Sequence, residues 1–292
     1  MFFERLSRGW ELAGQSWDVL KRDKELVLFP ILSGIACLLV IASFLLPMFF
    51  IPGLGQGVMG ALDGDRADNN PLAARIAYGA VLFAFYFVNY LVIVFFNTAL
   101  VSCAIIRFKG GDPTLGDGLR MASSRLPQIL GWAALSATVG VVLKMIEEKT
   151  DWVGHIVVGI LGTVWAVATY LAVPVLAVEG VGPVEALKRS GALIRKTWGE
   201  GLAGNFGFGI IGLLISLPGI ALIILGGFSF AKSVALGFAL VASGLFALLA
   251  ASIVLSTLKQ IFIAGLYVYA TEQKVPNGFS TDLMRSAFAP KR

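Results

Sequence analysis

The sequence predicts an all-α, polytopic membrane protein with six transmembrane helices, and three observations support that prediction. The 292 residues are 57% apolar and 14% charged, outside the range of water-soluble globular proteins. The apolar residues lie in six stretches, each long enough to cross the roughly 30 Å hydrocarbon layer of a bilayer. These stretches are continuous and do not alternate with polar residues, which favours helices over the strands of a membrane barrel.

The six expected spans follow one another along a single integral membrane domain, residues 1–292. They cover approximately residues 27–51, 76–106, 126–146, 152–178, 202–228 and 234–257. A polar segment, residues 1–26, precedes the first span. Residues 258–292 are expected to form a tail with a short helix at 281–288. In a second interpretation the last span continues to about residue 270.

Lysine and arginine residues predict the orientation of the spans. Of the 23 basic residues, 18 lie in the N-terminal segment, the tail and the connections after the second and fourth spans. The other three connections hold only five. Basic residues gather on the cytoplasmic side of membrane proteins, so both termini are expected in the cytoplasm. The predicted location is the inner (plasma) membrane of the cell.

The N-terminal segment reads as an amphipathic helix. Its apolar residues recur at intervals of three and four, which places them on one stripe: Phe3, Leu6, Trp10, Ala13, Trp17 and Leu20. Trp10 and Trp17 are expected to act as interfacial anchors, because indole rings favour the headgroup region of a bilayer. The helix is expected to lie along the inner membrane face or to pack under the bundle.

Two further segments of this kind follow the second and fourth spans. The first, "DPTLGDGLRMASSRLPQIL", begins with Thr114 and Asp117, a spacing typical of a helix-capping pair. The second, "VGPVEALKRSGALIRKTWGE", has Pro183 suited to a first helical turn and Trp198 as a third interfacial anchor. We therefore hypothesise three tandem modules, each a cytoplasmic amphipathic helix followed by a membrane hairpin.

Both ends of the chain resemble a known family. The N-terminal "RGWELAGQSWDVLKRDKELVLFP" and the C-terminal "VPNGFSTDLMRSAFAPK" are similar to an uncharacterised prokaryotic six-span integral-membrane family, a domain of unknown function. The resemblance implies a six-span membrane protein. It implies no activity, no cofactor and no catalytic residue.

Polar residues inside the expected spans are the candidate site residues. Asn89 and Asn97 lie on neighbouring faces of the second span, where amides either pair across helices or line a polar cavity. Thr257, Lys259 and Gln260 interrupt the last apolar stretch. Either the helix ends near Lys259 and the lysine extends to the interface, or Lys259 lies in the bundle as a site for an anionic ligand.

The fifth span contains two glycine motifs with more than one interpretation. Gly207, Gly209 and Gly212 match a dinucleotide fingerprint, but their place in an apolar span favours close helix packing. Pro218 and Gly219 in mid-span are expected to kink or break the helix.

Three function classes stay open at this point. The first is a non-enzymatic membrane module that organises lipids or partner proteins. The second is a channel or permease for a small solute, and the third, least favoured, is a membrane enzyme acting on lipid. The sequence contains no H-E-x-x-H motif, no G-x-S-x-G motif and no cluster of Cys and His ligands, and we expect no catalytic, metal-binding or cofactor-binding residue. The expected partners are membrane lipids, anionic inner-leaflet lipids above all, and a second copy of the chain, with no nucleic acid.

Overall fold

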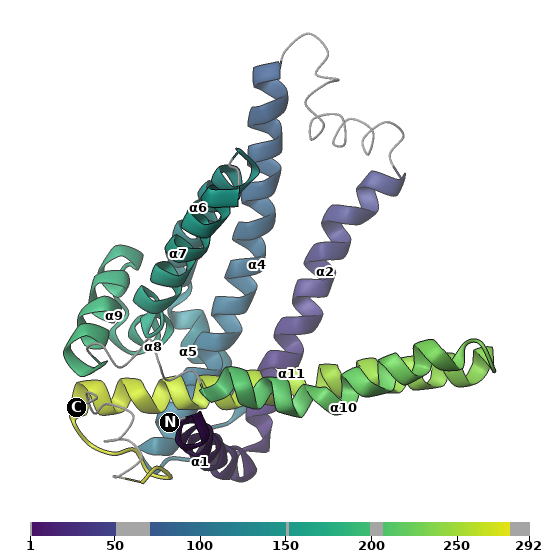
Figure 1. Cartoon of the computed structure of the whole chain (residues 1–292). Helices are drawn as coiled ribbons and strands as arrows, with labels where there is room; N and C mark the ends of the chain where they lie inside the picture. Colours follow the sequence, from purple (N-terminus) through teal and green to yellow (C-terminus); the bar gives the residue numbers. More distant parts are fainter. Residues whose placement is uncertain (1, 51–70, 150–151, 199–206, 281–292) are drawn as a thin grey trace. The chain divides into compact units, whose positions relative to one another are not determined.

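The computed structural model describes residues 2–50, 71–149, 152–198 and 207–280, and every regular element in these ranges is a helix (Figure 1). Contacts group the chain into two compact units, each built from separate segments. Unit 1 comprises Met1–Ile31, Leu100–Gly118 and Ala192–Arg292, and unit 2 comprises Leu32–Ala99 and Leu119–Gly191. We describe each unit by itself, and the single domain over residues 1–292 stays a prediction.

The six predicted spans are confirmed as helical within the described residues, and residues 51 and 202–206 of the predicted ranges lie outside them. Six helical segments of the described chain are long and apolar enough to cross a membrane: Lys24–Pro47, Tyr78–Phe108, Leu126–Glu148, Gly154–Glu179, Ile211–Ser229 and Val234–Glu272. The short helix expected at 281–288 lies outside the described residues.

In unit 1, helix α1 (Phe2–Arg22) packs against α10 (Gly207–Ser229) and α11 (Val234–Glu272). A 3-10 turn, η1 (Lys24–Val27), then leads into α2 (Leu28–Phe50). Among the described side chains of α1, those of residues 10–22, the buried ones are Leu12, Ala13, Ser16, Val19 and Leu20, and the side chains of Phe3 and Leu6 lie outside the described part of the structure. The apolar stripe expected from the sequence is therefore divided: part of it packs against protein, and the two tryptophans lie on an exposed face.

Helices α10 and α11 form a close antiparallel pair (Figure 1), and glycines permit the close approach. A Cβ atom on Gly244 would lie 2.7 Å from the backbone oxygen of Gly219, and one on Gly226 would lie 2.9 Å from the nitrogen of Val241. Helix α10 is continuous through Pro218, so the break expected there is absent. Gly207 begins the same helix, which places the glycine triplet inside a helix and not in a strand-to-helix turn.

The last span differs from the favoured prediction. Helix α11 does not end near Lys259 but runs unbroken to Glu272, as in the second interpretation. Its sequence contains no proline in this region, and the helix ends where Gln273 adopts a left-handed conformation with φ 54°.

Unit 2 contains the second hairpin, α6 (Leu126–Lys149) and α7 (Trp152–Ala168), with α8 (Ala172–Glu179). Trp132 and Trp165 stack between α6 and α7 with ring centroids 6.2 Å apart. Four of the described helices contribute to both units. They are α2, α4 (Pro71–Phe108), α5 (Leu115–Ser124) and α9 (Pro183–Trp198).

The fourth span is broken, which corrects the prediction of one continuous helix over 152–178. Helix α7 ends at Ala168 and α8 begins at Ala172. Pro174 explains the position of the break. Proline has no N–H to donate to the carbonyl of Tyr170, four residues earlier, and its ring would clash with that carbonyl in a continuous helix. The sequence therefore carried a signal for the break.

Candidate functional site

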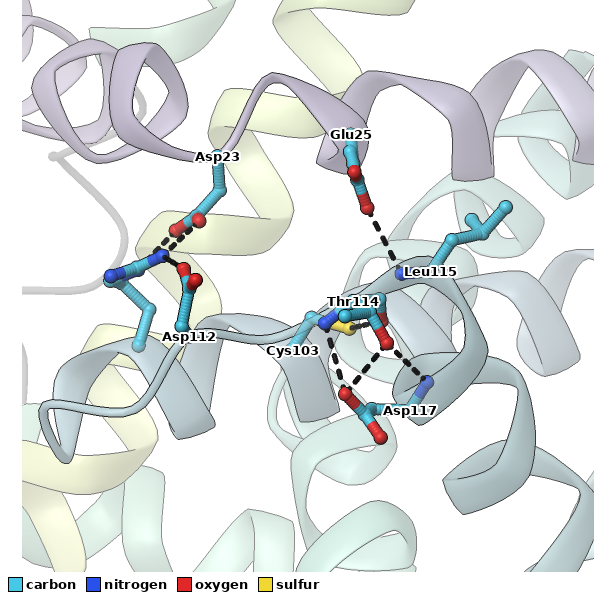
Figure 2. Close-up of polar contacts among 8 residues, drawn as sticks. Asp23, Glu25, Cys103, Asp112, Thr114, Leu115 and Asp117 are labelled. Atoms are coloured by element: carbon cyan, nitrogen blue, oxygen red, sulfur yellow. Dashed lines mark hydrogen bonds and ion pairs between the residues drawn. The ribbon is translucent and has the colours of Figure 1, made fainter.

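The main polar site of unit 1 begins at the junction of α1 and η1. We call it the Asp23 cluster, made of Asp23, Glu25, Arg107, Asp112, Thr114 and Asp117 (Figure 2). The Asp23 carboxylate is 6% exposed and accepts hydrogen bonds from Nε and Nη2 of Arg107, at the end of α4. Nη2 also donates to Asp112, which is 93% exposed. A bidentate guanidinium thus neutralises a buried carboxylate, which would otherwise be costly to desolvate.

The second half of the Asp23 cluster caps helix α5. The hydroxyl and backbone N–H of Thr114 both donate to Asp117 Oδ2, over 2.7 and 3.0 Å, and the Asp117 N–H donates to Thr114 Oγ1 over 3.2 Å. The capping pair predicted from the sequence is confirmed. Glu25 adds a contact that the sequence did not predict, since its carboxylate accepts the Leu115 N–H over 3.1 Å (Figure 2).

Two carboxylates therefore occupy the positive end of α5, and one of them comes from the start of the first span. Asp23 and Glu25, two residues apart, connect the N-terminal segment to the end of α4 and to the beginning of α5. The carboxylates are satisfied by a guanidinium or by backbone N–H groups. Such an arrangement holds helix ends at fixed positions.

The C-terminal segment joins the same region of unit 1. The Asn277 amide donates to the backbone oxygen of Phe108 over 3.0 Å, and the rings of Phe108 and Phe279 meet edge to face at 5.8 Å. Lys109 Nζ lies 3.4 Å from Glu272 Oε1, which links the end of α4 to the end of α11. None of these residues was among the sequence candidates, because no local pattern connects segments so far apart in the chain.

Unit 2 has a corresponding arrangement at the end of α8. The Arg125 guanidinium donates to the carbonyls of Ala177 and Val178 over 3.1 and 3.3 Å, and the Gln128 amide donates to that of Gly180 over 3.1 Å. The last carbonyls of a helix lack partners inside the helix and carry partial negative charge, so a cation there stabilises the end. Gly180 has φ 63°, and a Cβ atom there would lie 2.3 Å from Arg125 Nη1.

Helix α9 contacts both ends of α8. At the beginning of α8, where the fourth span is broken, the Leu171 N–H donates to the buried Ser190 hydroxyl of α9 over 3.0 Å. At the end of α8, Glu179 Oε1 lies 3.2 Å from Nε of Arg189, the residue before Ser190. The broken span thus satisfies its backbone through a side chain of the segment that follows it, which costs less than leaving an N–H unpaired in an apolar region.

The structure places the tryptophan candidates on the exposed face of α1. Trp10 is 59% exposed and Trp17 is 44% exposed. Gly14, between them on the same face, has no neighbour within 4 Å of a Cβ position. Trp198 is the last residue of α9, and its side chain lies outside the described part of the structure.

The asparagine candidates are half-buried in α4. The Asn89 amide donates to the Phe85 carbonyl of its own helix over 2.9 Å. Next to it, Tyr86 and Tyr90 stack with centroids 6.2 Å apart. This donor bond lies within one helix. Pairing of Asn89 and Asn97 across helices and the lining of a polar cavity by them both stay predictions.

Two candidates of the last span, Thr257 and Gln260, are three residues apart and lie on one side of α11. Thr257 is buried and donates to the Ile253 carbonyl over 2.8 Å. The Gln260 Oε1 atom is buried, and no described residue donates a hydrogen bond to it. Lys259 is exposed, on another side of the helix.

A comparison with protein families gives one match. The model of a family of unknown function, DUF6159, matches residues 76–279. The expected likeness to an uncharacterised family is confirmed, although the N-terminal motif precedes the matched region and the C-terminal motif overlaps it only at 275–279. None of the curated proteins matches the chain.

Proposed function

This chain belongs to the DUF6159 family, whose function is unknown, and we propose that it is a non-enzymatic multi-pass module that organises lipids at the inner face of the cell membrane. Both termini lie in the cytoplasm in this proposal. The distribution of basic residues, 18 of 23 on one side, supports that orientation.

One observation carries the proposal: α1 presents different faces to protein and to its surroundings. Leu12, Val19 and Leu20 pack against protein, whereas Trp10 and Trp17 stay exposed. The face with the two tryptophans is a second apolar surface on a helix whose other face already packs against protein. Such an exposed apolar surface is typical of a site that contacts another apolar partner. Because α1 leads through η1 directly into the first span, the headgroup layer of the same membrane is the nearest such partner.

The Asp23 cluster supports a fixed position for this face. The buried pair of Asp23 and Arg107 ties the end of α1 to the end of α4, which is itself a predicted span. A helix held in this way presents its tryptophans at a constant depth. An ordered aromatic face loses less conformational entropy on contact with lipid than a free peptide would.

The test uses the purified chain in lipid nanodiscs, with copurifying lipids measured by mass spectrometry. Trp10→Ala with Trp17→Ala is expected to lose retained lipid, whereas Trp10→Tyr with Trp17→Tyr, which keeps amphipathic rings, is expected to retain it. Equal lipid retention by wild type and the alanine variant would overturn the proposal. The same measurement gives the oligomer mass and so tests self-association.

The orientation is tested separately by side-specific amine labelling in sealed vesicles. Lys149 and Lys188 belong to connections predicted on opposite sides of the membrane. Labelling of both from the same side would contradict the proposed topology.

A second candidate, a channel or permease, is favoured by the break in the fourth span. Interrupted helices expose backbone groups to substrates in transporters. Here the N–H of Leu171 already donates to the Ser190 hydroxyl, so a solute could bind this N–H only after α9 moves. Solute uptake by proteoliposomes that increases in Ser190→Ala would favour this candidate over the lipid-organising module.

A further inference from the structure

The exposure of side chains along α11 changes abruptly at one point. Up to Leu249 many large apolar residues of the helix are exposed, with Phe246 72% exposed, and from Ile253 to Leu255 they are half-buried. From Thr257 to Val268 almost every side chain is buried, and α1 and η1 supply contacts to this helix. Apolar side chains need an apolar neighbour, so lipid covers the first part and protein covers the second.

The length of each part agrees with this division. At 1.5 Å per residue, residues 234–256 extend about 35 Å, close to the roughly 30 Å thickness of the hydrocarbon layer. The remaining part, to Glu272, extends about 24 Å farther. Since the whole helix is about twice the bilayer thickness, its last turns lie outside the hydrocarbon.

The other two second helices of the hairpins show the same change. In α4, Ile76, Val81 and Ile93 are exposed, and continuous burial begins at Thr98. In the fourth span, large apolar residues up to Val164 are exposed and burial begins at Leu171, with Val178 at the end of the span exposed again. Each change occurs roughly one bilayer thickness from the start of its helix, so the boundary on α11 is not an isolated feature.

Lys259 is the exposed side chain just beyond this boundary. Its neighbours one and two turns earlier, Ser256 and Ser252, are also exposed, and their hydroxyls bond to carbonyls of α11 itself. Within the described residues Lys259 has no acidic partner, in contrast to Lys21 and Lys109, which pair with acids. A cation without a counter-ion at the edge of the hydrocarbon lies at the depth of the lipid phosphates.

We infer that Lys259 binds the headgroup phosphate of an anionic phospholipid in the inner leaflet, with Ser252 and Ser256 beside the lipid chain. The inference rests on the proposed function, because it names a lipid class and the residue that binds it. It differs from both interpretations of Lys259 given above: the helix does not end at the lysine, and the lysine is assigned to the lipid-facing side of α11 and not to the bundle interior.

The test titrates the full chain in detergent with phosphatidylglycerol, or with phosphatidylcholine of the same acyl chains, and counts bound lipids by native mass spectrometry. Lys259→Gln is expected to weaken phosphatidylglycerol binding about fivefold, the effect of one basic residue near an anionic surface. Lys259→Arg should retain binding. Lys232→Gln, which removes an exposed lysine in the turn between α10 and α11, should leave binding unchanged.

Three outcomes would overturn the inference: unchanged phosphatidylglycerol binding in Lys259→Gln, an equal loss in Lys232→Gln, or competition by millimolar inorganic phosphate, which would indicate a site for the free anion. The tryptophan variants test the proposed function independently. If those variants lose lipid while Lys259→Gln does not, only the inference about Lys259 fails.

The boundary itself has a separate test in a chain whose two native cysteines are replaced by serine. A water-soluble maleimide is expected to label Lys259→Cys rapidly and Phe246→Cys at least tenfold more slowly, because hydrocarbon excludes the reagent and suppresses the thiolate. Equal labelling rates would place the boundary elsewhere and overturn the inference.

Discussion

Replacing Asp23 by alanine is expected to destabilise the folded protein by about 2–3 kcal/mol. Removing one partner of a buried ion pair costs roughly 3–5 kcal/mol, because the other charge remains desolvated. The Arg107 side chain is 21% exposed and keeps its contact with Asp112, so the expected cost is below that range. Removing Asp112, whose side chain is almost fully exposed, should cost about 0–1 kcal/mol although it contacts the same guanidinium.

The assay is thermal unfolding in nanodiscs, followed by circular dichroism, for wild type, Asp23→Ala and Asp112→Ala. For a chain of this size the expected decrease in Tm for Asp23→Ala is roughly 5–10 °C, with little change for Asp112→Ala. Arg107→Lys provides a further comparison, since a lysine cannot donate two parallel bonds to one carboxylate. Equal Tm values for the two aspartate variants would refute the argument that burial, and not proximity to Arg107, determines the contribution.

Three further predictions concern close contacts of the backbone. Gly244→Leu should lower the Tm by the equivalent of about 3 kcal/mol, because the new side chain meets backbone of α10, whereas Gly227→Leu, with open space around it, should not. Gly180→Ala should lower the free energy of unfolding by about 1–2 kcal/mol because of the positive φ alone, and the new methyl group should also displace the Arg125 guanidinium. Unfolding in denaturant would measure this loss of stability. Ser190→Ala should raise hydrogen exchange at the Leu171 amide roughly tenfold or more, since that N–H loses its buried acceptor; unchanged protection would show that another group satisfies it.

Several features could be predicted because they depend on residues near one another in sequence. The capping of α5 by Thr114 and Asp117 depends on a spacing of three residues, and the structure contains it. The break before α8 was missed although Pro174 signals it, because the stretch around the proline is uniformly apolar. The helical spacing of the apolar residues in α1 was recognised from the sequence. That spacing did not distinguish the residues that pack against protein from the two tryptophans that are exposed.

The ion pair of Asp23 and Arg107 could not be predicted from sequence patterns. Asp23 and Arg107 are 84 residues apart, and no local spacing connects them. The same holds for Ser190, one of several small polar residues in its segment, whose value lies only in its position opposite a free N–H. Pairing of polar groups across the chain depends on which helix ends meet, and that is a property of the packed structure.

The sequence by itself determined that this chain forms six apolar helices of membrane-spanning length with basic connecting segments, because hydropathy and charge add up locally along the chain. Only the tertiary structure decided where the side chains of α11 change from exposed to buried, since lipid and protein favour the same apolar residues. It also decided which charges are neutralised inside the protein and which, like Lys259, remain available to a partner.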